Sequence, residues 1–198
     1  MRVRIHTPLL IVALVSMAAP AAAQPRLSTD KPGYEFRLLA TSMTHTMEME
    51  LNRAAEEGFR FQTAMGGETA NGGNEVVVVM ARRAGEKPRV SYKLLATSKT
   101  STMEKELQAA ADQGFQYRAQ SVFKSAFGGD EVVCILERDA DIEPRHGQYR
   151  LLATTKTSTM DKELQTAGAA GYAIVGMTVG KTAFGGKELI AIMLRFDR

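Results

Sequence analysis

The chain has 198 residues, one cysteine and a formal net charge of +3 at neutral pH. A single cysteine excludes an intramolecular disulfide, and so small a charge argues against a nucleic-acid-binding protein, which needs a dense basic face. Cys134 lies between Val133 and Ile135, and these apolar neighbours indicate a buried, unreactive thiol.

Residues 1–23 have the pattern of a signal peptide. A basic start is followed by an apolar run over residues 9–19 and by three alanines that would precede cleavage before Gln24. The run has about half of the ~20 residues that a transmembrane helix needs. We therefore expect a periplasmic or secreted protein that keeps no transmembrane segment. Its net charge would be +1, because residues 1–23 hold two basic residues and no acidic one.

Three copies of one unit follow. Leu38, Leu94 and Leu151 occupy equivalent places at spacings of 56 and 57 residues. The same spacings relate three glycines and three glutamates, namely Gly58, Gly114, Gly171, Glu75, Glu131 and Glu188. A fixed period maintained along the chain is the signature of internal repeats.

The copies divide the chain into segments. After a short N-terminal linker, polar linkers that contain proline separate the repeats. The predicted segments are the linkers 24–33, 83–91 and 139–148, repeat 1 (34–82), repeat 2 (92–138) and repeat 3 (149–198).

Each copy has the pattern strand, helix, strand, strand. In repeat 2 a short apolar strand over 92–98 leads to a helix that ends at Gly114, where glycine adopts a left-handed cap without steric cost. A stripe of apolar residues at helical spacing marks the buried side of that helix: Met103, Leu107, Ala110 and Ala111. A Gly-Gly pair before the last strand of each copy predicts a β-hairpin: Gly72-Gly73, Gly128-Gly129 and Gly185-Gly186.

The helix starts resemble capping boxes. Ser101 and Glu104 in repeat 2 have the spacing at which a serine hydroxyl accepts a backbone N–H while the acidic residue reaches back. Ser158 and Asp161 take the same places in repeat 3. His45 replaces the serine in repeat 1, so a weaker helix start is expected there.

The last strands of the first and third copies are apolar on both sides. Residues 76–80 and 189–194 show no alternation of apolar and polar residues, which predicts that both faces of these strands are covered. One helix per repeat covers one face, so the other must meet a neighbouring repeat or another chain. A unit of about 50 residues also buries too little surface to be stable alone.

The fold class predicted is therefore α+β. We expect three tandem β-α-β-β repeats with antiparallel hairpins and one helix each, sharing a core. An approximate threefold arrangement is one way to share it.

The unit resembles a short bacterial β-α-β-β family of unknown function that usually occurs as a single copy. The resemblance rests on the opening Tyr92-Lys-Leu, on Leu107, on Gly114-Phe115 and on a last strand that ends at Arg138. It covers all three copies, although phenylalanine or tyrosine stands where the family prefers tryptophan. The resemblance implies the fold and no activity.

The turns before the second and third helices are candidate ligand sites. Each places a lysine and hydroxyls at a helix N-terminus, where the helix dipole and free N–H groups favour anions. The candidates are Lys99, Thr100, Ser101, Lys156, Thr157 and Ser158. The alternative is that turn and capping geometry alone account for these residues.

Repeat 1 carries a possible metal site in the same place. Met43, His45 and Met47 combine thioether and imidazole groups, which suit Cu(I). The alternative is that Met47 is the core methionine of the repeat and that the others are unrelated to metal. No other metal site and no cofactor are predicted.

These patterns favour an exported, non-catalytic binding or protein-interaction module. Its exposed turns and hairpin loops would meet another envelope protein or a second copy. Two alternatives stay open: a small-anion or Cu(I) carrier that uses the helix-start turns, and an enzyme whose site lies between repeats. The enzyme would need the three recurrent glutamates to converge.

Overall fold

The structure, a computed structural model, describes residues 33–70, 73–97, 100–124, 130–181 and 186–197. Repeat 1 consists of β1 (Tyr34–Thr41), α1 (Thr44–Glu56), β2 (Arg60–Thr69) and β3 (Gly73–Arg83). Repeat 2 consists of β4 (Val90–Thr97), α2 (Thr100–Ala111), β5 (Gln116–Lys124) and β6 (Asp130–Asp139). Repeat 3 consists of β7 (Gly147–Thr154), α3 (Thr157–Ala169), β8 (Ala173–Lys181) and β9 (Lys187–Phe196).

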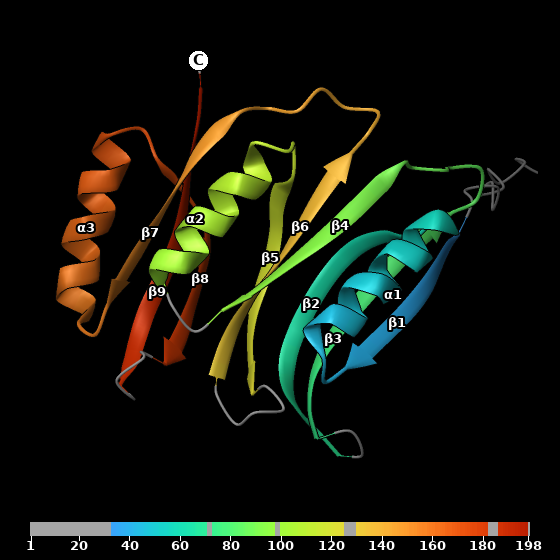
Figure 1. Ribbon diagram of the computed structural model, residues 1–198, viewed down its shortest axis with the longest axis horizontal. Coiled ribbons are helices and arrows are strands. Elements are labelled where there is room, and N and C mark those ends of the chain that lie inside the picture. Colours follow the sequence, from blue (N-terminus) through green and yellow to red (C-terminus); the bar gives the residue numbers. More distant parts are fainter. Residues whose placement is uncertain (1–32, 71–72, 98–99, 125–129, 182–185, 198) are drawn as a thin grey trace, which may run out of the picture. The chain divides into compact units, whose positions relative to one another are not determined.

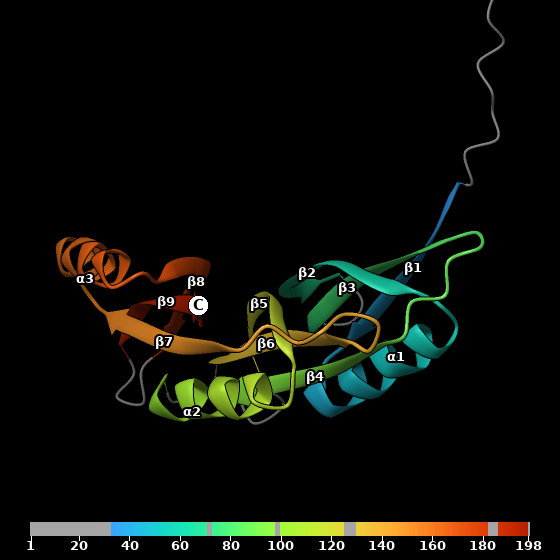
Figure 2. The ribbon, with the colours of Figure 1, turned by 90° about the horizontal axis from the view of Figure 1, so that it is seen from above.

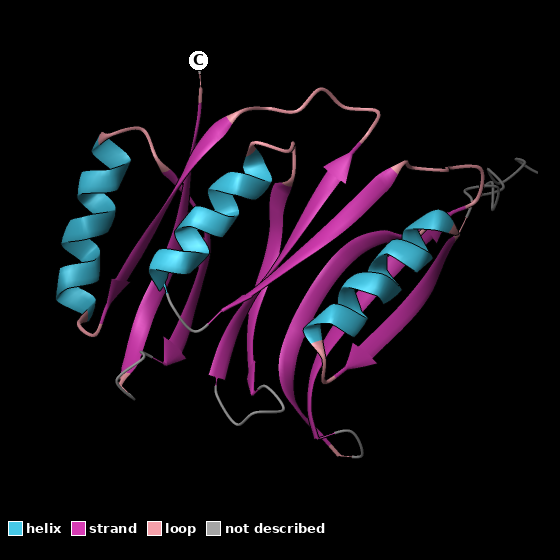
Figure 3. Cartoon of the chain, viewed as in Figure 1, coloured by secondary structure: helices cyan, strands magenta, loops and turns pink. Residues whose placement is uncertain are grey.

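The predicted fold class is confirmed, because each repeat forms its own antiparallel sheet of three strands. The strand orders are β1-β3-β2, β4-β6-β5 and β7-β9-β8, so the last strand of each repeat is central. Figure 3 shows the same succession of strand, helix and two strands three times. Each second strand carries an irregularity at the same place, which leaves Gln62, Arg118 and Val175 unpaired in the ladders.

The glycine that ends each helix has the predicted conformation. Gly58, Gly114 and Gly171 have φ values of 90°, 85° and 85°, which L-residues with a Cβ rarely adopt. The aromatic residue after each glycine lies under the arginine one residue before the end of the last strand. In repeat 3, for example, the Arg195 guanidinium is 4.8 Å from the centre of the Tyr172 ring.

The predicted capping boxes are wrong. Helix α3 begins at Thr157 with Lys156 at its N-cap and no side-chain cap hydrogen bond, so Ser158 lies inside the first turn. The Thr154 hydroxyl instead accepts the backbone N–H of Lys156 at 3.3 Å. The helix therefore starts two residues earlier than the Ser-x-x-Asp spacing indicates, with Lys156 rather than Ser158 at its N-cap.

The repeats join through their helices and sheets. Helix α1 packs between β1 of its own repeat and β4 of the next, and α2 packs between β4 and β7. Figures 1 and 2 show this alternation of helices with the opening strands of successive repeats. One core cluster combines α1 and β3 with residues of β4 and β6, and the next combines α2 and β6 with residues of β7 and β9.

This packing has a direction. One face of each sheet, here called the front, carries the helix of its own repeat. The opposite face, the back, packs onto the preceding repeat: Tyr92 and Ile135 on the back of the second sheet belong to the core of repeat 1. Tyr149 and Ile192 on the back of the third sheet belong to the core of repeat 2. Repeat 1 meets repeat 2 and repeat 2 meets repeat 3, so the repeats form a series rather than a threefold arrangement.

The prediction that residues 76–80 and 189–194 are covered on both sides is correct for β9 and wrong for β3. Strand β6 is covered on both sides as well. Val76, Val78 and Met80 on the front of β3 are buried. Val77 and Val79 on the back are only partly buried, because no preceding repeat exists among the described residues to cover them.

Several predictions fall outside the described residues. They are the signal peptide over 1–23, most of the linker over 24–33, Lys99, and the hairpin residues Gly72, Gly128, Gly129 and Gly185. Within the described part of the chain, none of the helices has the length and apolarity that crossing a bilayer requires.

Candidate interaction surfaces

Helix α1 holds the opening strand of repeat 2 by its backbone. The Asn52 side chain donates to the carbonyl of Tyr92 and accepts the N–H of the same residue, both at 2.9 Å. One turn earlier, the Glu48 carboxylate accepts the N–H of Leu94 at 2.7 Å. These two helix residues thus satisfy the outer edge of β4, which would otherwise end the sheet with open backbone groups.

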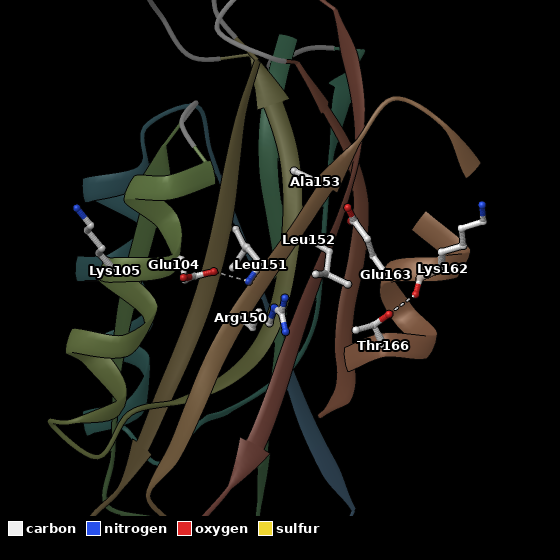
Figure 4. A pocket seen from close by; sticks show the side chains of 9 residues that line it. All are labelled: Glu104, Lys105, Arg150, Leu151, Leu152, Ala153, Lys162, Glu163 and Thr166. Atoms are coloured by element: carbon white, nitrogen blue, oxygen red, sulfur yellow. Dashed lines mark hydrogen bonds between the residues drawn. The ribbon is translucent and has the colours of Figure 1, made fainter. Parts of the chain in front are cut away.

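Helix α2 repeats the device on β7. Gln108 donates to the Gly147 carbonyl at 3.2 Å and accepts the Tyr149 N–H at 3.0 Å. Glu104 accepts the Leu151 N–H at 2.7 Å, as the dashed line in Figure 4 shows. The glutamate predicted to cap its own helix therefore binds the next repeat.

Helix α3 presents the same pair without a strand to bind. Asp161 and Gln165 occupy the positions equivalent to Glu104 and Gln108, and both are exposed. Neither makes a hydrogen bond or an ion pair with any residue that the structure describes. We call these two residues, together with the half-exposed Ile174, Met177 and Val179 on the front of the third sheet, the open face of repeat 3.

The other end of the series exposes the complementary surface. Phe36 is 66% exposed, whereas its equivalents Tyr92 and Tyr149 are 3% and 7% exposed. Leu38 is also 66% exposed. The open face of repeat 1 is the back of its sheet, made by Phe36, Leu38, Met65, Val77 and Val79.

The interface between repeats 1 and 2 also contains a buried carboxylate. Glu137 on β6 is 2% exposed. It accepts hydrogen bonds from Arg60 of repeat 1 at 2.6 Å and from the Tyr92 hydroxyl at 2.8 Å, and it pairs with Arg118, the irregular residue of β5. The Tyr92 hydroxyl in turn accepts the N–H of Phe61 at 2.8 Å.

The electrostatics of Glu137 explain why it can be buried. Burial by itself would raise the pKa of Glu137, but the hydrogen bonds from Arg60 and Tyr92 and the charge of Arg118 outweigh it and hold that pKa below its ordinary value. The equivalent residues are Ala81 and Leu194. The cluster is thus a specific polar contact between repeats 1 and 2, and its charged groups are paired with one another.

The second interface is less polar. The Tyr149 hydroxyl accepts the N–H of Tyr117 at 3.0 Å, as Tyr92 does in the first interface. Cys134 is fully buried, which confirms the burial expected from its neighbours, and burial raises the pKa of its thiol to about 12. This thiol is therefore a packing residue and not a nucleophile at neutral pH.

An open groove of about 610 Å³ lies between α2 and α3, with β7 as its floor. Figure 4 shows Glu104 and Glu163 turned toward β7 and the ammonium groups of Lys105 and Lys162 on the outer sides of the helices. Arg150 adds one cation on the floor. Because charges of both signs line it and Glu104 is already bound to the strand, the groove has no distinct preference for an anion.

The predicted anion residues of repeat 3 lie together on the surface. Lys156, Thr157 and Ser158 are all exposed at the start of α3. The backbone of Thr100 and Ser101 opens α2 in the same way, while their side chains lie outside the described set. Among the described residues, no other polar side chain joins Lys156, Thr157 and Ser158 to complete an anion site.

The predicted Cu(I) ligands are separated. Met47 is fully buried in the core of repeat 1, beside Leu51. Met43 and His45 are exposed. The structure thus places Met47 as the core methionine, equivalent to Met103 and Met160.

The recurrent glutamates belong to different sheets. Glu75 lies near the start of β3 and accepts a hydrogen bond from the Thr69 hydroxyl, whereas Glu131 lies in β6 and Glu188 near the start of β9. Repeat 2 separates Glu75 from Glu188. Among the described residues, the structure forms no cluster of three or more histidine, cysteine, aspartate or glutamate side chains suited to a metal ion.

Sequence reasoning missed the residues that join the repeats. The signal was present: an acidic residue and an amide follow one another at a spacing of four in each helix, as Glu48 and Asn52, Glu104 and Gln108, and Asp161 and Gln165. Residues at this spacing lie on one helix face, next to the apolar stripe. Their recurrence beside a buried face indicates a shared polar contact.

Comparison of the chain with protein-family models, with curated proteins and with solved structures finds no match. The resemblance to the β-α-β-β family therefore stays a prediction from the residues.

Proposed function

We propose that this chain is an exported, non-catalytic protein-interaction module that binds partners through the two open faces of its repeat series. One observation carries the proposal: surfaces that are covered at both internal interfaces are open at the two ends. Single exposed apolar side chains are ordinary, but a contiguous apolar face commonly marks a protein interaction site.

The binding mode follows from the internal interfaces. Each internal interface places an opening strand on the front of the preceding repeat and bonds its backbone to one helix. The open face of repeat 3 therefore offers a strand of a partner two things: an apolar surface to pack on and the helix side chains Asp161 and Gln165. These side chains would recognise the strand through hydrogen bonds to its main chain. The proposed binding surfaces are therefore these two sheet faces, whereas the sequence predicted that exposed turns and hairpin loops would contact the partner.

The experiment is site-specific crosslinking in the cells that produce the protein. A photo-reactive residue replaces Leu38 in one variant and Met177 in another, with Met49 as the matched control, since all three side chains are exposed and apolar. We expect covalent adducts with an identified protein from Leu38 and Met177 and none from Met49. Adducts absent from both faces, or equally frequent at Met49, would overturn the proposal.

A further inference from the structure

We infer that the partner of each open face is a second copy of this chain, bound head to tail, so that repeat 1 of one molecule covers repeat 3 of another. This inference rests on the proposed function and names the partner for it. The new interface would repeat the two that already exist within the chain.

The open face of repeat 1 has the composition of the faces that are covered. At the internal interfaces, the residues packed onto the preceding repeat are Tyr92 and Leu94 in repeat 2, and Tyr149 and Leu151 in repeat 3. Repeat 1 keeps a large apolar residue at both places, Phe36 and Leu38. The apolar pattern of β3 is a second indication, because Val77 and Val79 are typical of a covered face.

The open face of repeat 3 is the equivalent of the receiving surface. In repeat 2 that surface includes Tyr117 and Val122, which lie against the back of the third sheet. Their equivalents in repeat 3 are Ile174 and Val179, and both are about half exposed. By this equivalence, Phe36 of one molecule would lie beside Ile174 of the other, as Tyr149 lies beside Tyr117.

A second pair of residues that would meet across the proposed interface is also apolar. At the first interface, a Cβ on Gly66 would lie 2.5 Å from the Ser121 hydroxyl oxygen, so the two sheets approach closely there. The equivalent positions at the proposed interface are Val179 and Met65. Both are exposed and apolar, but they are larger than Gly66 and Ser121, so the two sheets must lie farther apart here than at the first interface.

Helix α3 supplies the polar half of the contact. Gln165 is equivalent to Asn52 and Gln108, which bond the backbone of Tyr92 and of Gly147 and Tyr149. On the opening strand of a second copy, the corresponding group is the backbone of Phe36. Strand β1 lies at the edge of its sheet, so its outer backbone groups face away from β3.

The contact is heterologous, since two different surfaces meet. Such a contact forms rings if the rotation between copies closes and open filaments if it does not. A symmetric pairing of two repeat 1 faces would leave α3 and the open face of repeat 3 uncovered. Head-to-tail contact covers both faces with the same arrangement of opening strand, sheet and helix that the chain already uses twice.

Two departures from the internal pattern make the inference testable by gain of affinity. Asp161 is one methylene shorter than Glu48 and Glu104, and Phe36 lacks the hydroxyl that Tyr92 and Tyr149 use to accept a backbone N–H. We expect Asp161→Glu and Phe36→Tyr each to strengthen association several-fold by completing those hydrogen bonds.

The test is sedimentation velocity of the purified full chain over a range of concentrations. We expect species larger than a dimer to grow with concentration. Leu38→Lys and Ile174→Lys should each weaken association about a hundredfold or more, because each buries an unpaired ammonium group. Met49→Lys is the matched control and should associate like the parent, since lysine already stands at its equivalents Lys105 and Lys162.

Mixing the two disabled variants distinguishes the geometries. Each variant retains one working face, so an equimolar mixture should form dimers and nothing larger. A parent chain that stays monomeric at every concentration would overturn the inference, as would an Ile174→Lys variant that dimerises like the parent. Far-ultraviolet circular dichroism checks that both variants fold, and the two gain-of-affinity variants test the same interface without disrupting it.

The two proposals fail differently. If the purified chain is monomeric but crosslinking from Leu38 and Met177 captures another identified protein, the self-association fails and the interaction module stands. If the faces crosslink nothing, the proposed function itself fails.

Discussion

Glu104 on α2 accepts the backbone N–H of Leu151, 2.7 Å away in the next repeat. Glu48 and Leu94 form the same contact between repeats 1 and 2. The helices of repeats 1 and 2 therefore each do two things: the apolar stripe fills the core of the helix's own repeat, and the adjacent polar side chains satisfy the edge of the following sheet. Because each helix contacts the repeat that follows it, these hydrogen bonds fix which repeats are neighbours in the folded chain.

Loss of one such link should destabilise the chain measurably. We expect Glu104→Ala to lower the free energy of unfolding by about 1–3 kcal/mol, because it leaves the Leu151 N–H without its acceptor. Urea denaturation followed by circular dichroism measures the change. Asp161→Ala is the matched control and should stay within about 0.5 kcal/mol under dilute conditions. Equal losses in the two variants would contradict the assigned role of Glu104.

The buried Glu137 predicts both a variant effect and a pH effect. Glu137→Gln should lower the free energy of unfolding at neutral pH by about 3 kcal/mol, because it leaves Arg60 and Arg118 without their anion. The folded pKa of Glu137 lies below its reference value of 4.5. Its ionised form therefore favours folding above that pH, and this contribution is lost as the pH falls through the folded pKa.

The measurement is urea denaturation of the parent and of Glu137→Gln at a series of pH values. The parent should lose its advantage over the variant as the pH falls below 4.5. An advantage that is constant from neutral to acid pH would show that the Glu137 carboxylate does not fasten the repeats.

The two interface tyrosines should differ in the cost of losing the hydroxyl. Tyr92 donates to Glu137 and accepts the Phe61 N–H, whereas Tyr149 accepts only the Tyr117 N–H among the described contacts. We expect Tyr92→Phe to cost about 1–3 kcal/mol of unfolding free energy and Tyr149→Phe about 1 kcal/mol. Thermal or urea unfolding gives both values. The reverse order would contradict the hydrogen bonds described.

The Cys134 thiol should be unreactive in the folded chain. It is fully buried and its pKa is raised to about 12, so almost no thiolate is present at neutral pH. Iodoacetamide should modify it only in denaturant, as mass spectrometry of the intact chain would show. Rapid alkylation without denaturant would mean that the interface between repeats 2 and 3 opens readily.

The N-terminal segment gives a prediction about export. If residues 1–23 are a signal peptide, the protein recovered from the cell envelope or the medium should begin at Gln24. N-terminal sequencing or the intact mass decides the point. Recovery of a chain that retains Met1 and its apolar run would contradict cleavage.

How much could be predicted from the sequence depended on the distance over which each signal acts. The Met103 and Leu107 stripe and the Gly114 cap were predictable because helical spacing and left-handed glycine are local properties. The helix start was not, because Ser158 offers a capping spacing that the turn at Thr154 and Lys156 overrides.

For the candidate interaction surfaces, the sequence identified apolar and charged residues but did not show which residues they contact. An apolar β3 predicted a cover for both faces, and the structure shows that the back of this strand is the uncovered one. Glu137 gave no local sign of its role, because its partner Arg60 lies 77 residues away.

The sequence by itself determined three repeats of one β-α-β-β unit, since periodicity and local propensity act within a unit. Only the tertiary structure decided that each repeat places the back of its sheet on the one before it. That choice depends on how neighbouring units pack, and it turns Glu104 from an expected cap into a link to Leu151. It also leaves two open faces, with Phe36 and Leu38 at one end of the series and Gln165 at the other. Each is equivalent to a surface that is covered inside the chain.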